Sequence, residues 1–152
     1  MKAVILSGCE SSRDAVPPDT EKLNELCTVT YNDKTYSVSI TNLEQGMFSE
    51  SFILPENIAD TVYTFTGEGC DIIRGSLSVH TDRSYLAENS LPRRIYNTFR
   101  IIRNTEEPQF AGEDKENGYC IFIIDDYRIT TNKTDGKIFR IETNDGSFIM
   151  QF

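Results

Sequence analysis

The sequence predicts a mainly β protein of the α+β type, in which antiparallel strands form a sheet and one principal helix packs against it. Two observations support this prediction: short segments that alternate apolar and polar residues between turns, and one later segment with helical periodicity. The regular strand–helix alternation that is typical of a parallel sheet is missing. With 152 residues, the chain is long enough to bury a core as one domain.

The first predicted strands form a hairpin. Apolar residues alternate with threonine or serine in residues 27–31 and 36–40, and Asn32-Asp33-Lys34 connects the two runs. A third strand precedes the break at Pro55. It carries three large apolar residues on one face with an acid between them: Phe48, Phe52, Leu54 and Glu50.

The same pattern predicts further strands before and after the helix. They cover residues 62–66, 70–73, 76–80, 119–124, 127–131, 138–143 and 147–152. Short segments rich in glycine, asparagine and aspartate separate these strands and are expected to form turns. The expected total is about nine or ten short strands arranged as a meander.

The principal helix is predicted near residues 91–103. Four apolar side chains form one stripe along it: Leu91, Ile95, Phe99 and Ile102. Its four arginines are expected in solvent: Arg93, Arg94, Arg100 and Arg103. A short helix is also expected in residues 20–26, and the acidic, Pro- and Gly-containing residues 104–117 are expected to form a surface loop.

The N-terminus predicts the location of the protein. Its apolar run ends in Leu6-Ser7-Gly8-Cys9, which resembles a bacterial lipobox, the signal that attaches a diacylglyceryl group to the cysteine. The resemblance implies a truncated lipoprotein signal peptide in residues 1–8, and a lipidated Cys9 with a flexible tether in residues 9–19. A β domain then occupies residues 20–152. The protein would be extracytoplasmic, periplasmic or extracellular, and anchored to the bacterial membrane by two acyl chains.

A second interpretation of the same residues stays open. Residues 1–8 could be a first buried strand, which resembles the opening of sugar nucleotidyltransferases, and the chain would then be a cytoplasmic enzyme. Those enzymes continue into a glycine-rich phosphate loop that ends in a basic residue, whereas Cys9-Glu10-Ser11 follows here. The two interpretations differ in whether residues 1–8 pack into the domain.

The charge of the chain disfavours two kinds of partner. With 15 basic and 24 acidic residues, the formal net charge is −9, which disfavours binding to nucleic acid and adsorption of the domain to anionic lipid. No apolar run approaches the roughly 20 residues of a transmembrane helix. Membrane attachment is therefore expected through the lipid on Cys9.

The cysteines indicate no metal site. None of Cys9, Cys27, Cys70 and Cys120 forms a CxxC pair, so zinc-ligand spacing is missing. If Cys9 is lipidated, the other three can form one disulfide and a free thiol, or remain three thiols. Because cysteine is among the most buried residue types, three buried thiols are favoured.

Three segments together resemble the small LolA-like lipoproteins of bacteria, the superfamily that includes the carriers LolA and LolB. They are the hairpin at residues 31–38, the stretch Phe52-Ile53-Leu54-Pro55-Glu56-Asn57-Ile58 followed by Gly67-Glu68-Gly69, and the late pair at residues 136–142 and 148–152. The resemblance covers about residues 25–152 and implies a curved antiparallel sheet, an unclosed barrel, whose concave face is covered by the helix. Members bind acyl chains or other apolar groups in that concavity, or act as protein-contact domains.

The excess of aromatic residues fits either a filled core or a lined cavity. A sheet covered by one helix needs large apolar residues to fill it, and the filled core is the favoured interpretation. If the helix leaves part of the face uncovered, a ligand pocket of about 300–1,000 Å³ results. Its expected lining residues are Phe52, Val62, Ile72, Phe99 and Ile123.

No catalytic residue, metal site or cofactor is predicted. His80 is the single histidine, and no G-x-S-x-G motif accompanies it. Asp125-Asp126 lacks the acid spacing of a calcium loop and is expected to be a turn. The expected function is a non-enzymatic lipoprotein that binds an apolar ligand or lipid moiety in the sheet concavity. The alternative is a lipoprotein interaction module without a pocket that contacts a protein partner.

Overall fold

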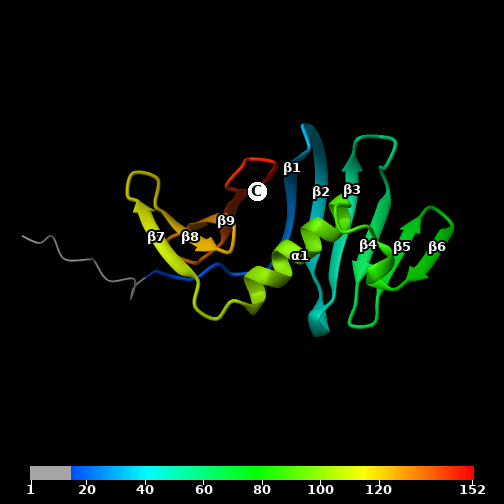
Figure 1. Cartoon of the computed structure of the whole chain (residues 1–152), viewed down its shortest axis with the longest axis horizontal. Helices are drawn as coiled ribbons and strands as arrows, with labels where there is room; N and C mark the ends of the chain where they lie inside the picture. The colour runs from blue at the N-terminus through cyan, green and yellow to red at the C-terminus, as the bar shows by residue number, and fades with distance from the viewer. Residues whose placement is uncertain (1–14) are drawn as a thin grey trace, which may run out of the picture.

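The computed structural model describes residues 15–152, in which eleven strands form one antiparallel sheet and one α-helix packs on it (Figure 1). The strands before the helix are β1 (Asn24–Tyr31), β2 (Lys34–Asn42), β3 (Phe48–Leu54), β4 (Thr61–Phe65), β5 (Cys70–Arg74) and β6 (Leu77–Thr81). Those after it are β7 (Gln109–Asp114), β8 (Tyr119–Ile124), β9 (Tyr127–Asn132), β10 (Ile138–Thr143) and β11 (Phe148–Gln151). The helical elements are α1 (Leu91–Asn104) and the short 3-10 turns η2 (Glu44–Gly46) and η3 (Arg83–Tyr85).

The sheet consists of two meanders joined at β1 and β11. Its strand order is β6-β5-β4-β3-β2-β1-β11-β10-β9-β8-β7, so β6 and β7 are the two edges and the barrel is unclosed. Helix α1 follows β6 and precedes β7 in the chain, so it connects the two edges. It crosses the concave face between the two meanders (Figure 1). The predicted mainly β, unclosed antiparallel sheet with one covering helix is confirmed.

The core lies between α1 and the concave face. Every residue of the predicted helical stripe is buried, as the 3.6-residue period requires. Phe99 lies with its ring centre 5.2 Å from that of Phe48 on β3, and Tyr96 stacks on Phe65 of β4 at 4.3 Å. Aromatic packing of this kind fixes the helix on the sheet.

Two predicted elements are wrong. Residues 20–26 form no helix, because β1 begins at Asn24 and pairs with β2 from Asn24–Thr41 to Tyr31–Lys34. Residues 104–117 are not a loop throughout, because β7 pairs with β8 there and carries a register shift between Phe110 and Gly112. The structure therefore has one strand more than the upper estimate from the pattern.

The described part of the predicted tether lies against the sheet. The Asp19 backbone N–H donates a hydrogen bond of 2.9 Å to the Gly136 carbonyl oxygen, and Ala15 packs against the core. A Cβ atom on Gly136 would lie 2.3 Å from the carbonyl oxygen of Pro17, so this segment approaches a turn that only glycine fits. Residues 15–19 are thus docked to the domain. Residues 1–8 and Cys9 lie outside the described residues.

Among residues 15–152, no helix is long and apolar enough to cross a bilayer.

Candidate functional site

An apolar pocket of about 450 Å³ opens beside the first turn of α1. Its floor comes from β2, β3 and β4, one wall from the loop after β3, and the other wall from the start of the helix. Its lining residues are Lys34, Tyr36, Phe52, Pro55, Asn57, Ile58, Tyr63, Leu91 and Pro92. The volume lies within the range of small-molecule sites, and most of the lining is apolar, as such sites require.

The aromatic floor of this pocket is rigid. The Phe52 ring makes edge-to-face contacts with Tyr36 at 6.4 Å and with Tyr63 at 5.6 Å, which places three rings from three neighbouring strands side by side. Phe52 itself is only 2% exposed, while the two tyrosines are half-buried. The floor is therefore preformed, and an apolar group that enters meets ring surface without a rearrangement of the sheet.

The middle of the concave face is filled. Phe99 is buried between Phe48 and Phe152, whose ring centres lie 5.2 and 6.2 Å away. Thr98, on the same helix turn, is also fully buried; its hydroxyl donates to the Arg94 carbonyl oxygen and accepts a hydrogen bond from the Tyr127 hydroxyl. In this region side chains fill the space between α1 and the sheet, whereas the neighbouring pocket stays open.

Glu50 lies in this filled region with no exposed surface. Neither carboxyl oxygen has a hydrogen-bond partner; the Tyr96 backbone approaches the group without reaching hydrogen-bond geometry. Burial raises the pKa of Glu50 well above its ordinary value of 4.5, and the Tyr96 backbone opposes this shift only partly. Burial in the apolar core therefore favours the protonated, neutral form of this side chain.

The three described cysteines are buried free thiols, so the favoured interpretation of their state is confirmed. Burial raises the pKa of Cys27 to about 12, and the nearby Glu50 adds to the shift. Burial and the same glutamate also raise the pKa of Cys70 to about 12. Because the thiolate is the reactive form, both side chains are inert core residues at neutral pH.

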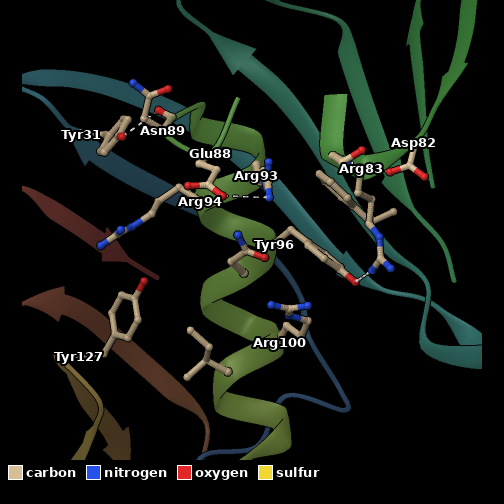
Figure 2. Close-up of a pocket in the computed structure, with 14 residues that line it drawn as sticks. Tyr31, Asp82, Arg83, Glu88, Asn89, Arg93, Arg94, Tyr96, Arg100 and Tyr127 are labelled. Carbon is tan, nitrogen blue, oxygen red and sulfur yellow. Dashed lines mark hydrogen bonds and ion pairs between the residues drawn. The ribbon is translucent and has the colours of Figure 1, made fainter. Parts of the chain in front are cut away.

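A second hollow, which we call the arginine cleft, lies over the outer side of α1 (Figure 2). It is open to solvent, has a volume of about 730 Å³ and is lined mainly by polar groups. Four guanidinium groups contribute to it, from Arg83, Arg93, Arg94 and Arg100, together with the tyrosines Tyr31, Tyr96 and Tyr127. Two acids, Asp82 and Glu88, also line it.

The residues that were expected to bind a ligand lie on two different sides of the sheet. Phe52 and Phe99 are buried on the concave face, and Ile72 packs against the same core. Val62 faces the other way, because it pairs with Ser51 and Ile73 while its neighbours Thr61 and Phe65 are buried.

Ile123 also faces away from the concavity. It lies between the buried Phe122 and Ile124 and pairs with Gln109 and Arg128 on the convex face. Since successive strand residues point to opposite faces, neither Val62 nor Ile123 lines the concavity. Among the expected lining residues, only Phe52 borders the apolar pocket.

The expectation that all four helix arginines lie in solvent is correct for two of them. Arg100 and Arg103 are exposed, but Arg93 and Arg94 are half-buried. The Arg93 guanidinium donates to the Leu86 carbonyl oxygen at 2.6 Å, and the Arg94 guanidinium lies over the Tyr127 and Phe148 rings. The signal that could have revealed the cleft was the concentration of arginines in one helix of an acidic chain.

The other polar candidates form ordinary surface contacts. His80 pairs with Asp71 through its Nδ1 atom at 2.5 Å, on the exposed surface of β5 and β6. Asp125 and Asp126 form the turn between β8 and β9. Within residues 15–152, no three histidine, cysteine or acidic side chains gather as metal ligands.

Neither the scan against protein-family models nor the searches of curated proteins and solved structures gave a match.

Proposed function

We propose that this protein is a LolA-like, membrane-anchored bacterial lipoprotein that works outside the cytoplasm and binds an acyl chain or similar apolar group in the apolar pocket. The observation that carries the proposal is the pocket of about 450 Å³ beside the first turn of α1. It has a preformed aromatic floor and adjoins a face that is otherwise filled. No catalytic step is needed for this function.

The proposal joins the pocket with the N-terminal sequence. The lipobox-like Leu6-Ser7-Gly8-Cys9 supports anchoring through lipid on Cys9, and the unclosed sheet with its covering helix supports the LolA-like assignment. Mass spectrometry of the membrane fraction should find a lipid-modified N-terminal Cys9. Intact Met1 on soluble protein from the native cell would contradict the anchoring.

Ligand binding is tested with a fluorescent fatty acid and the full chain carrying Cys9→Ser, which prevents lipidation. The parent should bind the probe saturably, and Ile58→Glu should weaken binding at least tenfold, because it places a charge in an apolar wall. The matched control is Ile123→Glu, another half-buried isoleucine on the opposite face next to Arg128, which should leave uptake unchanged.

The alternative function is a protein-contact module. It is favoured by the edge strand β6, whose Leu77 and Val79 are 72% and 57% exposed. Edge strands with apolar side chains can accept a strand of another chain. Two results together would favour this alternative. Neither Ile58→Glu nor Ile123→Glu would lose fatty-acid binding, and the parent would self-associate in a concentration-dependent manner that Val79→Lys removes.

A further inference from the structure

We propose that the arginine cleft is a second ligand site, distinct from the apolar pocket, and that it binds a small phosphorylated molecule through Arg83 and Arg100. Four arginines line this hollow in a chain whose net charge is −9. In Figure 2, Arg83 and Arg100 lie toward Tyr96, whereas Arg94 points toward Tyr127 on the other side of α1.

The acids of the cleft compensate only part of its positive charge. Asp82 interacts electrostatically with the adjacent Arg83, whereas Arg100 has no acidic partner among the described residues. Glu88 forms an ion pair with Arg93 at 3.7 Å, and the Asp82 carboxylate accepts the Ser84 backbone N–H at 2.8 Å. Among residues 15–152, no carboxylate lies within ion-pair distance of Arg83, Arg94 or Arg100. Apart from the Arg83 N–H group that donates to the Tyr96 hydroxyl, their terminal N–H donors are therefore available to a ligand.

The guanidinium groups of Arg83 and Arg94 are held in place on the two sides of the helix. Arg83 donates to the Tyr96 hydroxyl at 2.5 Å, and the Tyr96 ring is itself stacked on Phe65. Arg94 lies 5.5 Å from the Tyr127 ring centre and 5.4 Å from that of Phe148. Its buried Nε atom has no hydrogen-bond acceptor. Arginines that are ordered before binding lose little conformational freedom when an anion arrives.

A phosphoryl group fits this donor set better than a carboxylate. It offers three terminal oxygens and a charge of about −1.5 to −2 at neutral pH, whereas a carboxylate offers two oxygens and one charge. Guanidinium groups bind phosphate oxygens in a bidentate manner. Side-chain amides and hydroxyls around the rim, from Ser84, Asn89 and Asn97, supply further hydrogen bonds to the rest of the molecule.

The ligand must be small because the surrounding charge is negative. An acidic peptide or an anionic bilayer extends beyond the cleft and meets the field of a chain with nine excess negative charges. A compact phosphorylated molecule stays inside the volume of about 730 Å³. The chemistry therefore favours a phosphorylated small molecule over a polyanionic partner.

The test is a calorimetric titration of the full Cys9→Ser chain with inorganic pyrophosphate at constant ionic strength. The parent should bind saturably. Arg83→Gln and Arg100→Gln should each weaken affinity at least fivefold, and the double variant at least twentyfold. The matched control is Arg103→Gln, which removes an exposed arginine of the same helix outside the cleft and should change affinity less than twofold.

Three results would overturn the proposal. One is no saturable binding of pyrophosphate by the folded parent, whose fold is checked by circular dichroism. Another is equal weakening in the Arg103→Gln control. The third is tighter binding of hexaglutamate, or of phosphatidylglycerol vesicles, with the same dependence on Arg83 and Arg100. Fatty-acid uptake should be unchanged in all these variants, so failure here is distinguishable from failure of the apolar pocket.

Discussion

The two ends of the contact between α1 and the sheet differ in how completely side chains fill them. Around Phe99 the helix is packed against aromatic rings, and even the carboxyl group of Glu50 is enclosed there. Around Leu91 the helix stands over a pocket of about 450 Å³ with a floor of three rings. One sheet face thus serves as a core in one place and as a ligand surface in another.

The difference arises from what lies beside each turn of the helix. The turn at Phe99 is flanked by Phe152, whose ring packs edge-to-face against Phe99 and fills the space beside the helix. The turn at Leu91 is flanked by the loop after β3, whose Pro55 and Ile58 line the pocket without filling it. Loop geometry, more than strand composition, decides where space remains.

The largest expected effect follows from truncation in the filled region. Phe99→Ala should lower the free energy of unfolding by about 3–5 kcal/mol, because it removes a buried ring and leaves a cavity. Denaturant unfolding of the variant and the parent measures it. A small stability loss with weaker fatty-acid uptake would mean that Phe99 is a pocket wall. If neither stability nor uptake changes, α1 does not cover the sheet as described and the LolA-like assignment fails.

The second effect is a pH dependence that originates at Glu50. Since its pKa is raised in the folded chain, the folded state keeps a proton that the unfolded chain has already lost. The stability from this proton is fully present below about pH 4.5 and falls by about 1.4 kcal/mol per pH unit above it, until the folded-state pKa is reached.

Glu50→Gln should remove this slope, because glutamine does not titrate. Denaturant midpoints measured between pH 4 and 8 compare the parent with the variant, and the exposed Glu68→Gln serves as the control that keeps the parental slope. Equal slopes in all three chains would show that Glu50 is accessible to water in the folded state.

A smaller effect is expected where the helix borders the pocket. Leu91→Ala should lower stability by about 2 kcal/mol, at the low end for buried leucines, because one side of Leu91 already faces open space. It should also weaken fatty-acid uptake several-fold through lost apolar contact. A stability loss as large as that of Phe99→Ala, with unchanged uptake, would place Leu91 in the filled core instead.

The smallest effect is expected on the outer side of the helix. Arg100→Ala should change stability by less than about 0.5 kcal/mol, because the side chain is exposed and has no ion pair among the described residues. Thermal unfolding without added anions measures it. A larger loss would give Arg100 a structural role and weaken its assignment to a ligand.

Much of the fold could be predicted because its strands follow the two-residue period. The hairpin after Cys27 and the helical stripe from Leu91 to Ile102 were both correct. Strand β7 could not be predicted, because its half-exposed sequence contains glycine and acids and its register shifts beside Gly112. The expected helix at residues 20–26 failed because β2 supplies backbone partners that outweigh a weak local preference.

The site was harder to predict than the fold. Val62 and Ile123 are apolar residues on a face that is not the core, so residue type alone could not assign their direction. The two-residue period does place Glu50 with Phe48 and Phe52, but its complete burial depends on how α1 crosses the sheet. The cleft depends on arginines from η3 and α1, which only the tertiary structure brings together.

Photo-crosslinking with a diazirine fatty acid tests most directly whether the open end of this contact is the ligand site. The full Cys9→Ser chain is labelled and each modified residue is located by mass spectrometry, with and without an excess of unlabelled fatty acid. Competable labels should appear on the pocket residues Phe52, Ile58 and Leu91. Competable labels concentrated on Ile123 of the convex face or on Leu77 and Val79 of the β6 edge would contradict binding in the pocket, as would the absence of any competable label.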